Sequence, residues 1–333
     1  MTYSAGGLIQ ATDYNGFVST TAGANLNATW GTAVSGSGYG QGNVATVSAS
    51  ATVSATEWAT LVNKISSMAS HQGTTITSRT APTAGATITA LAAVNTDLTN
   101  CYTNRNNAAS QGTQYGTFTG TTSKTTGTGS GSSAWTITFT HTVTFANASA
   151  TFAFFNSGGS IKVQFGKTSS ATEADTEWND LAGTLCGAIF LTGAGTSKTI
   201  NGTAYTGTTK VGGTGTPSTL STATGAYALL TTNTTLYQQY ADTAPYTGQY
   251  IAVAAKVDST SAPTVITFTT TWVDPGGSGA GSTDAISGGT ATTSPATSIT
   301  GTAPTTLVTY FPPESTYLTV NSWGVPTITA AVV

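Results

Sequence analysis

The stretch WTITFTHTVTF, residues 135–145, decides the fold of this chain. Its odd positions carry apolar or aromatic side chains, with His141 among them, and threonine fills every even position. A period of two built from β-branched and aromatic residues is typical of a strand that buries one face and exposes the other. We therefore expect this strand at the centre of a large β core. We expect His141 to be a hydrogen-bonded core or edge residue.

Several later segments repeat the alternation and extend the predicted β region. Residues 161–165, 250–257 and 265–273 alternate apolar and polar side chains, and the tail from 307 to 333 alternates again around a Pro-Pro pair. The pattern over residues 227–237 fits a strand or a short helix, and the sequence does not choose between them.

The first third of the chain holds an internal duplication. IQATDYNGFV at 9–18 matches VSATEWATLV at 53–62, and each copy places an acidic residue and an aromatic residue after Ala-Thr. Residues 54–57 of the second copy read Ser-x-x-Glu, which is a capping box at a helix start. We expect two helices that bury Tyr14 and Trp58 against each other.

These patterns predict an α+β fold that is mainly β, with a small amino-terminal helical module followed by a β-rich, sandwich-like region containing one or two short helices. Further helices are expected at 88–104, 146–155 and 172–185. The expected divisions are a helical module at 1–115, a Thr/Gly/Ser linker at 116–134, a β-rich domain at 135–273, a Gly/Ser/Thr loop or arm at 274–303, and carboxy-terminal strands at 304–333.

The composition restricts the function. Charged residues make up 6% of the 333 positions, against about 25% in ordinary soluble domains, and the net charge is −3. The sequence has no basic patch for nucleic acid and no apolar run long enough to span a membrane. Because it also lacks a basic and apolar leader, we expect a protein that is made in the cytoplasm and is not sent through the general secretory route by a leader of its own. A polar surface with few charges suits proteins that pack side by side or contact sugars.

Nothing in the sequence assembles a catalytic site. The chain has two histidines, His71 and His141, and two cysteines, Cys101 and Cys186, which we expect to be buried and unpaired. Zinc sites and catalytic triads depend on histidine and cysteine side chains, and this chain has few of either. We therefore expect no enzymatic activity, no catalytic residues, no cofactor and no metal.

The densest acidic group is Glu173, Asp175, Glu177 and Asp180. A calcium site or a catalytic carboxylate pair is one interpretation of this group. A solvated, dipole-stabilised start of a helix is the interpretation we prefer.

Four tyrosines, Tyr237, Tyr240, Tyr246 and Tyr250, follow one another closely in the β region. Such a group could contact a glycan, could contact another subunit, or could pack within the strands. They are the only residues that the sequence offers as a contact site.

A family resemblance appears at the duplicated module. The segments that carry it are YSAGGLIQATDYN at 3–15, WG at 30–31, GYGQ at 38–41, ATEWATL at 55–61, SHQ at 70–72, HTVTFANAS at 141–149 and FFNSGG at 154–159. As a set these resemble a group of virion structural proteins of tailed bacteriophages, common in cyanophages and other aquatic phages. The match covers roughly residues 3–190. The resemblance implies a virion component assembled in the host cytoplasm, without catalytic residues and without a defined position on the particle.

The expected function is thus a non-enzymatic structural component of a phage virion. A self-associating tail, baseplate or fibre protein is the first interpretation, and a capsid decoration protein or a glycan-binding host-surface adhesin is the alternative. A capsule-degrading enzyme has the least support, because no solenoid repeat of 20–30 residues is present. The expected partners are further copies of the chain, other virion proteins and, for an adhesin, host-surface glycan.

Self-association is expected from strand edges and from the apolar end of the chain. Long strands such as 265–273 offer edges that something must cover. The segment 325–333 should pack on the β core or on a neighbouring copy.

Overall fold

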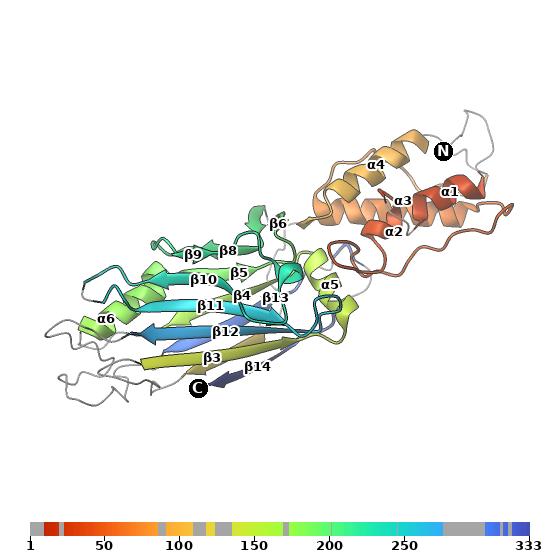
Figure 1. Cartoon of the computed structure of the whole chain (residues 1–333). Helices are drawn as coiled ribbons and strands as arrows, with labels where there is room; N and C mark the ends of the chain where they lie inside the picture. Colours follow the sequence, from red (N-terminus) through yellow and green to blue (C-terminus); the bar gives the residue numbers. More distant parts are fainter. Residues whose placement is uncertain are drawn as a thin grey trace.

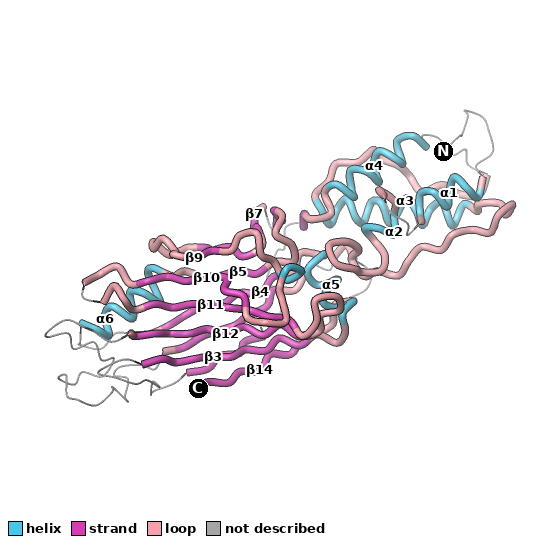
Figure 2. Tube along the Cα trace, viewed as in Figure 1, coloured by secondary structure: helices cyan, strands magenta, loops and turns pink. Residues whose placement is uncertain are grey.

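The computed structural model shows a helical module next to a β sandwich (Figure 1). It describes residues 10–19, 23–85, 91–108, 118–123, 135–168, 173–200, 202–244, 246–275, 304–313, 316–318 and 322–333. The predicted α+β fold that is mainly β is confirmed, since strands outnumber helices and build three sheets (Figure 2). Nearly all of the predicted arm at 274–303 lies outside the described residues.

The described residues of the amino-terminal module form four helices. They are α1 (Ala11–Val18), α2 (Leu26–Thr29), α3 (Ala55–Gln72) and α4 (Leu91–Thr103). The predicted capping box begins α3: the Ser54 hydroxyl accepts from the Glu57 amide at 3.2 Å, and the Glu57 carboxylate accepts from the Ser54 amide at 2.7 Å. The helix ends at Gly73, whose φ of 66° is the left-handed conformation that glycine tolerates best.

The duplicated segments form equivalent helix starts, as predicted. Asp13 of α1 accepts a hydrogen bond from the Gln10 amide at 3.3 Å, which mirrors the bond between Glu57 and Ser54 in α3. The two copies pack on each other: the ring of Trp58 lies 6.3 Å from that of Tyr14 and 5.9 Å from that of Phe17. Tyr14, Phe17 and Trp58 are all buried, so the repeat forms the core of the module.

Two asparagines hold an extended segment against these helices. The Asn15 side chain donates to the carbonyl of Val47 and accepts from its amide, each at 2.8 Å. Asn27 makes the same pair of bonds with Val44, each at 2.9 Å. Each asparagine therefore satisfies both backbone groups of its partner, as a neighbouring strand would.

The larger sheet of the sandwich has six antiparallel strands. Their order across the sheet is β14 (Thr327–Val332), β3 (Trp135–Thr144), β12 (Val265–Asp274), β11 (Tyr250–Val257), β10 (Thr234–Tyr240) and β9 (Thr219–Leu220). The strand with the clearest period in the sequence is β3, and it lies between β14 and β12. The undecided segment 227–237 resolves into the end of a 3-10 turn, Ala226–Ala228, followed by the first part of β10.

The opposing sheet has five antiparallel strands. Their order is β2 (Phe118–Ser123), β13 (Thr305–Phe311), β4 (Ser160–Gly166), β5 (Ala188–Leu191) and β8 (Thr208–Val211). One prediction was wrong here: residues 118–123, assigned to a linker, form β2 and pair with β13. The Thr- and Gly-rich sequence has no alternating apolar pattern from which a strand could be predicted. The segment forms a strand because it pairs with β13.

The two sheets bury their facing side chains against each other. Ile137, Phe139 and Val143 of β3 are buried, while the threonines between them are half-buried or exposed. Across the core, the indole of Trp272 on β12 donates to the hydroxyl of Thr306 on β13 at 3.4 Å. His141 lies on the inward face, opposite Phe268 of β12, and is fully buried.

Two helices lie at opposite ends of the sandwich (Figure 1). One, α5 (Ala148–Asn156), follows β3 and lies on the side of the helical module. The other, α6 (Glu173–Asp180), continues into a π-helical turn, Leu181–Leu185, and lies at the far end. Both positions agree with the predicted helices.

A small third sheet joins the two parts of the chain. Its strands are β1 (Asn107–Ala108), β6 (Ser197–Ile200) and β7 (Thr203–Thr206). The strand β1 directly follows the last helix of the module and pairs in parallel with β6 of the β region. The Asn156 amide of α5 also donates to the carbonyls of Val34, Ser37 and Gly38 in the module.

The structure corrects the expectation about edges. Strand β12 lies inside the sheet, between β11 and β3, so residues 265–273 offer no free edge. The apolar end of the chain forms β14 and packs on β3 within the same molecule. Among the described residues, no strand pairs with the other edge of β14, although β2 lies close to β14 without pairing with it.

Candidate functional site

The four predicted contact tyrosines lie in and after β10, but they do not form one surface. Tyr237 is fully buried: its hydroxyl donates to the Cys186 carbonyl at 3.1 Å, and its ring stacks on that of Phe165. Tyr246 is also buried. Only Tyr240 and Tyr250 remain to contact a glycan or a subunit through their rings.

Tyr240 and Tyr250 form a cross-strand pair between β10 and β11. Their ring centroids lie 5.2 Å apart with the planes inclined by 54°, and 38% of Tyr240 is exposed. Burial, and then the neighbouring Tyr240, raises the pKa of Tyr250, so its phenol stays neutral at physiological pH. An aromatic pair with hydroxyl donors can pack against an uncharged polar ligand or another protein surface.

The two histidines have structural positions. His71, near the end of α3, is buried with its Nε2 atom 2.9 Å from the Ser157 carbonyl oxygen, and its ring lies edge-on to Tyr39. His141 belongs to β3, inside the sandwich. The preferred interpretation of His141 as a core residue is confirmed.

The two cysteines are unpaired and buried, as predicted. Burial, followed by the nearby Asp97 charge, raises the pKa of Cys101 to about 12. Burial also raises the pKa of Cys186 to about 12. Because the thiolate is the nucleophilic form, neither residue is activated for covalent chemistry.

The predicted acidic group is only partly preserved as a cluster. Glu177 and Asp180 lie on one face of α6, three residues apart, whereas the side chains of Glu173 and Asp175 lie outside the described residues. A residue that the sequence reasoning missed, Asp242, joins Glu177 and Asp180 from the segment after β10. The sequence gives no signal for this contact, because it arises only from the packing of α6 against the large sheet.

The third candidate surface is the outer edge of β14. Thr327, Thr329, Ala330 and Ala331 are exposed, and 70% of the terminal Val333 is exposed. An edge strand presents a row of backbone donors and acceptors that can pair with another strand. No charged residue lies within 322–333 to discourage such pairing.

Comparison with protein-family models, with curated proteins and with solved structures found no match. Within the part of the chain that is described, no helix is both long and apolar enough to cross a lipid bilayer.

Proposed function

We propose that this chain is a non-enzymatic structural component of a tailed-bacteriophage virion, which self-associates in a tail, baseplate or fibre. The proposal rests on the resemblance of residues 3–190 to phage virion proteins and on one structural observation. That observation is the edge strand β14, whose backbone has a strand partner on one side only among the described residues.

The chemistry of β14 suits pairing with a second copy. Natural edge strands are commonly protected by lysine, proline or a bulge. In contrast, β14 reads TITAAV, and its register with β3 runs without a shift from Thr327 to Val332. Antiparallel pairing of two β14 strands would join two six-stranded sheets and would bury Val333 at the same time.

The surface of the larger sheet favours the same conclusion. Its outward positions on β3 and β12 are mostly threonines, and these face one another in register: Thr138 with Thr271, Thr140 with Thr269, and Thr142 with Thr267. Such a face carries little charge to keep copies apart. This threonine face therefore allows subunits to pack closely, and the low net charge of the whole chain favours the same packing.

Sedimentation velocity on the full chain tests the assembly. We expect a concentration-dependent oligomer for the native protein and a shift to monomer for Ala331→Lys, which places a charge on the exposed edge. The matched control is Leu230→Lys, which adds the same charge at another exposed apolar site and should leave the oligomer intact. A native protein that stays monomeric at high concentration contradicts self-association through β14.

Labelling tests the position on the particle. Gold attached to the amino terminus and viewed on purified virions by electron microscopy should appear on the tail, baseplate or fibre. Labels spread over the capsid would favour a decoration protein, and virions without any label would overturn the proposal.

A second candidate, a glycan-binding adhesin, is favoured by one observation: the partly exposed pair of Tyr240 and Tyr250. A glycan array separates the two functions. An adhesin would bind a defined glycan, and Tyr240→Ala would abolish that binding, whereas a purely structural protein would bind none.

A further inference from the structure

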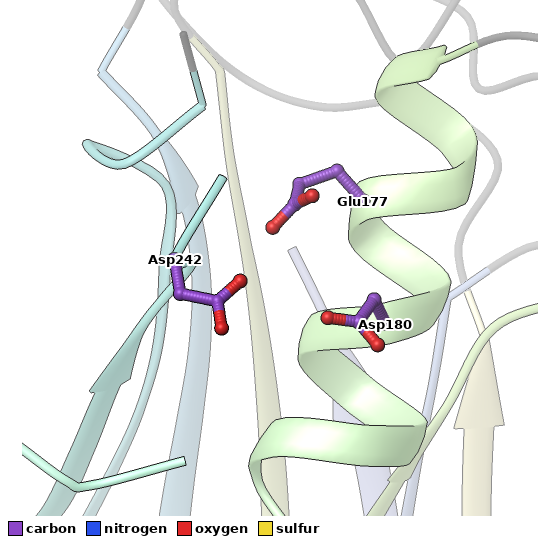
Figure 3. Close-up of side chains that lie close together, drawn as sticks. All are labelled: Glu177, Asp180 and Asp242. Atoms are coloured by element: carbon purple, nitrogen blue, oxygen red, sulfur yellow. The ribbon is translucent and has the colours of Figure 1, made fainter. Parts of the chain in front are cut away.

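A cluster of three carboxylates lies between α6 and the segment that follows β10 (Figure 3). Glu177 and Asp180 project from α6, and Asp242 projects toward them from the other side. One carboxylate oxygen from each residue lies within 4.8 Å of the other two. Three negative charges thus converge from two segments that are distant in the sequence.

Within the part of the chain that the structure describes, no basic side chain forms a salt bridge with the cluster. Among the described residues, the salt bridge between Arg79 and Asp97 is the only one, and it belongs to the helical module. Carboxylates that converge without a basic partner repel one another. A proton or a bound cation relieves this repulsion.

The burial of Glu177 is a second observation that points to a ligand at this cluster. Only 6% of this residue is exposed, and its Oε1 atom is buried without a hydrogen-bond partner, although Thr243 donates hydrogen bonds to the carboxylate group. In Figure 3 its carboxylate points away from the helix axis toward Asp242. A buried carboxylate oxygen that accepts no hydrogen bond is costly, so such an atom calls for a partner.

A cation satisfies these groups better than a proton does. A proton on Glu177 would remove one of the three charges and leave the two aspartates facing each other. A divalent cation would attract all three carboxylates at once and would give Oε1 a partner.

The type of ligand restricts the cation, and the spacing of the oxygens is compatible with calcium. Carboxylate oxygens are hard ligands, which exclude soft metals and favour calcium or magnesium. Calcium binds oxygen at about 2.3–2.6 Å, so two oxygens on opposite sides of one ion lie about 4.6–5.2 Å apart. Magnesium binds oxygen at about 2.0–2.1 Å in a stricter octahedral geometry and keeps more of its waters, so it is the weaker candidate for a site of three carboxylates.

We propose that Glu177, Asp180 and Asp242 form a calcium site that fastens α6 to the large β sheet. Glu177 supplies the buried ligand. Asp180, which is half-buried, and Asp242, which is exposed, leave the outer part of the ion open to water, which completes the six to eight ligands that calcium takes. This site differs from the sequence-based expectation of no metal, because Asp242 joins the cluster only in the folded chain.

The first test is thermal unfolding of the full chain in EDTA and in calcium chloride. An ion that binds only the folded state raises the unfolding midpoint, and the rise grows with the calcium concentration. We expect the midpoint to rise by several degrees in calcium, and to rise less in magnesium. No rise at about 10 mM calcium, which exceeds the dissociation constants of the weakest ordinary calcium sites, would overturn the proposal.

Variants locate the ion. Asp242→Asn changes an exposed residue and should fold, but should lose most of the rise, and Glu177→Gln should lose all of it. In EDTA, Glu177→Gln should unfold at a higher temperature than the native protein, because it removes one of three repelling charges. The control, Asp258→Asn, alters a carboxylate in the turn between β11 and β12 and should keep the full calcium response.

Terbium luminescence gives a second readout. Terbium substitutes for calcium, and Trp178 is the direct neighbour of Glu177 in α6, where it can sensitise the bound ion. We expect emission on excitation of tryptophan, displaced by calcium and absent in Asp242→Asn. Emission that is unchanged in this variant would place the ion elsewhere and overturn the assignment.

Discussion

The indole of Trp178 stacks on the indole of Trp272, with the ring centroids 5.6 Å apart and the planes inclined by 27°. Trp178 belongs to α6 and Trp272 to β12, and both are fully buried. Trp272 also lies edge-on to Phe139 of β3 and to Phe165 of β4, which belongs to the opposing sheet. This pair is therefore where α6 is anchored in the core of the sandwich.

Trp178→Ala should lower the free energy of unfolding by about 3–5 kcal/mol, the usual cost of deleting a buried aromatic side chain. The loss has two parts: the apolar area of the ring and the cavity left beside Trp272. Urea denaturation followed by circular dichroism measures it. The control is Leu230→Ala, at a site that is 54% exposed, which should change stability by less than about 0.5 kcal/mol.

Trp58→Ala tests the duplicated module in the same way. Because Trp58 is 2% exposed and contacts both Tyr14 and Phe17, we expect a loss of about 3–5 kcal/mol. Fluorescence-monitored unfolding should show the loss in the transition of the helical module. A cost below about 1 kcal/mol would mean that the two copies do not depend on each other for stability.

The sequence predicted those parts of the fold that depend only on residues close together along the chain. The capping box at Ser54 and Glu57 and the period of two in β3 each need only a few neighbouring residues, and both appear in the structure. Strand β2 shows the opposite case. Its sequence, FTGTTS, shows no alternation of apolar and polar residues. It becomes a strand through its pairing with β13.

The candidate sites were predicted less well, for a geometric reason. Tyr237 and Tyr240 are three positions apart in one strand, so they point to opposite faces, and a count of tyrosines along the chain cannot show this. That parity was the signal available in the sequence. Asp242 had no such signal, since its approach to Glu177 depends on how a whole helix packs on a sheet.

Asn156 connects the sandwich to the helical module, and its replacement should loosen this junction. Its amide nitrogen lies 2.9 Å, 2.6 Å and 2.9 Å from the carbonyl oxygens of Val34, Ser37 and Gly38, and its oxygen accepts from the Tyr227 hydroxyl at 2.6 Å. Asn156→Ala removes these hydrogen bonds, including the one to the carbonyl of the buried Gly38, which should cost about 1–3 kcal/mol.

Asn156→Asp should cost more than Asn156→Ala, because a carboxylate has the same shape but can only accept hydrogen bonds. It would place a negative charge against three carbonyl oxygens. Hydrogen exchange of the amides at 34–38 should report the loosening, and thermal unfolding should report the loss. The matched control is Asn233→Asp at an exposed site; equal effects at both positions would contradict the role of Asn156.

A buried lysine at the same junction should make the stability depend on pH. Lys198 of β6 donates from its Nζ atom to the carbonyls of Phe155 and Asn156, at the carboxy-terminal end of α5. Burial, with a smaller effect of the Arg105 charge, lowers the pKa of Lys198 from 10.5 to about 7. In the unfolded chain this amine is solvated and keeps its ordinary pKa.

Between these two pKa values the unfolded chain binds the proton more tightly than the folded chain, so Lys198 makes stability rise with pH. The contribution is complete above the unfolded value and is lost as the pH falls toward about 7. The two buried cysteines act in the opposite direction once the unfolded thiols ionise, near about pH 8.5. Comparison with Lys198→Met removes the effect of the cysteines, since both proteins carry both cysteines.

We expect the stability of the native protein relative to Lys198→Met to rise by up to about 1.4 kcal/mol per pH unit above neutrality, measured by urea denaturation. A stability difference that stays constant over this interval would show that Lys198 has the same affinity for its proton in both states.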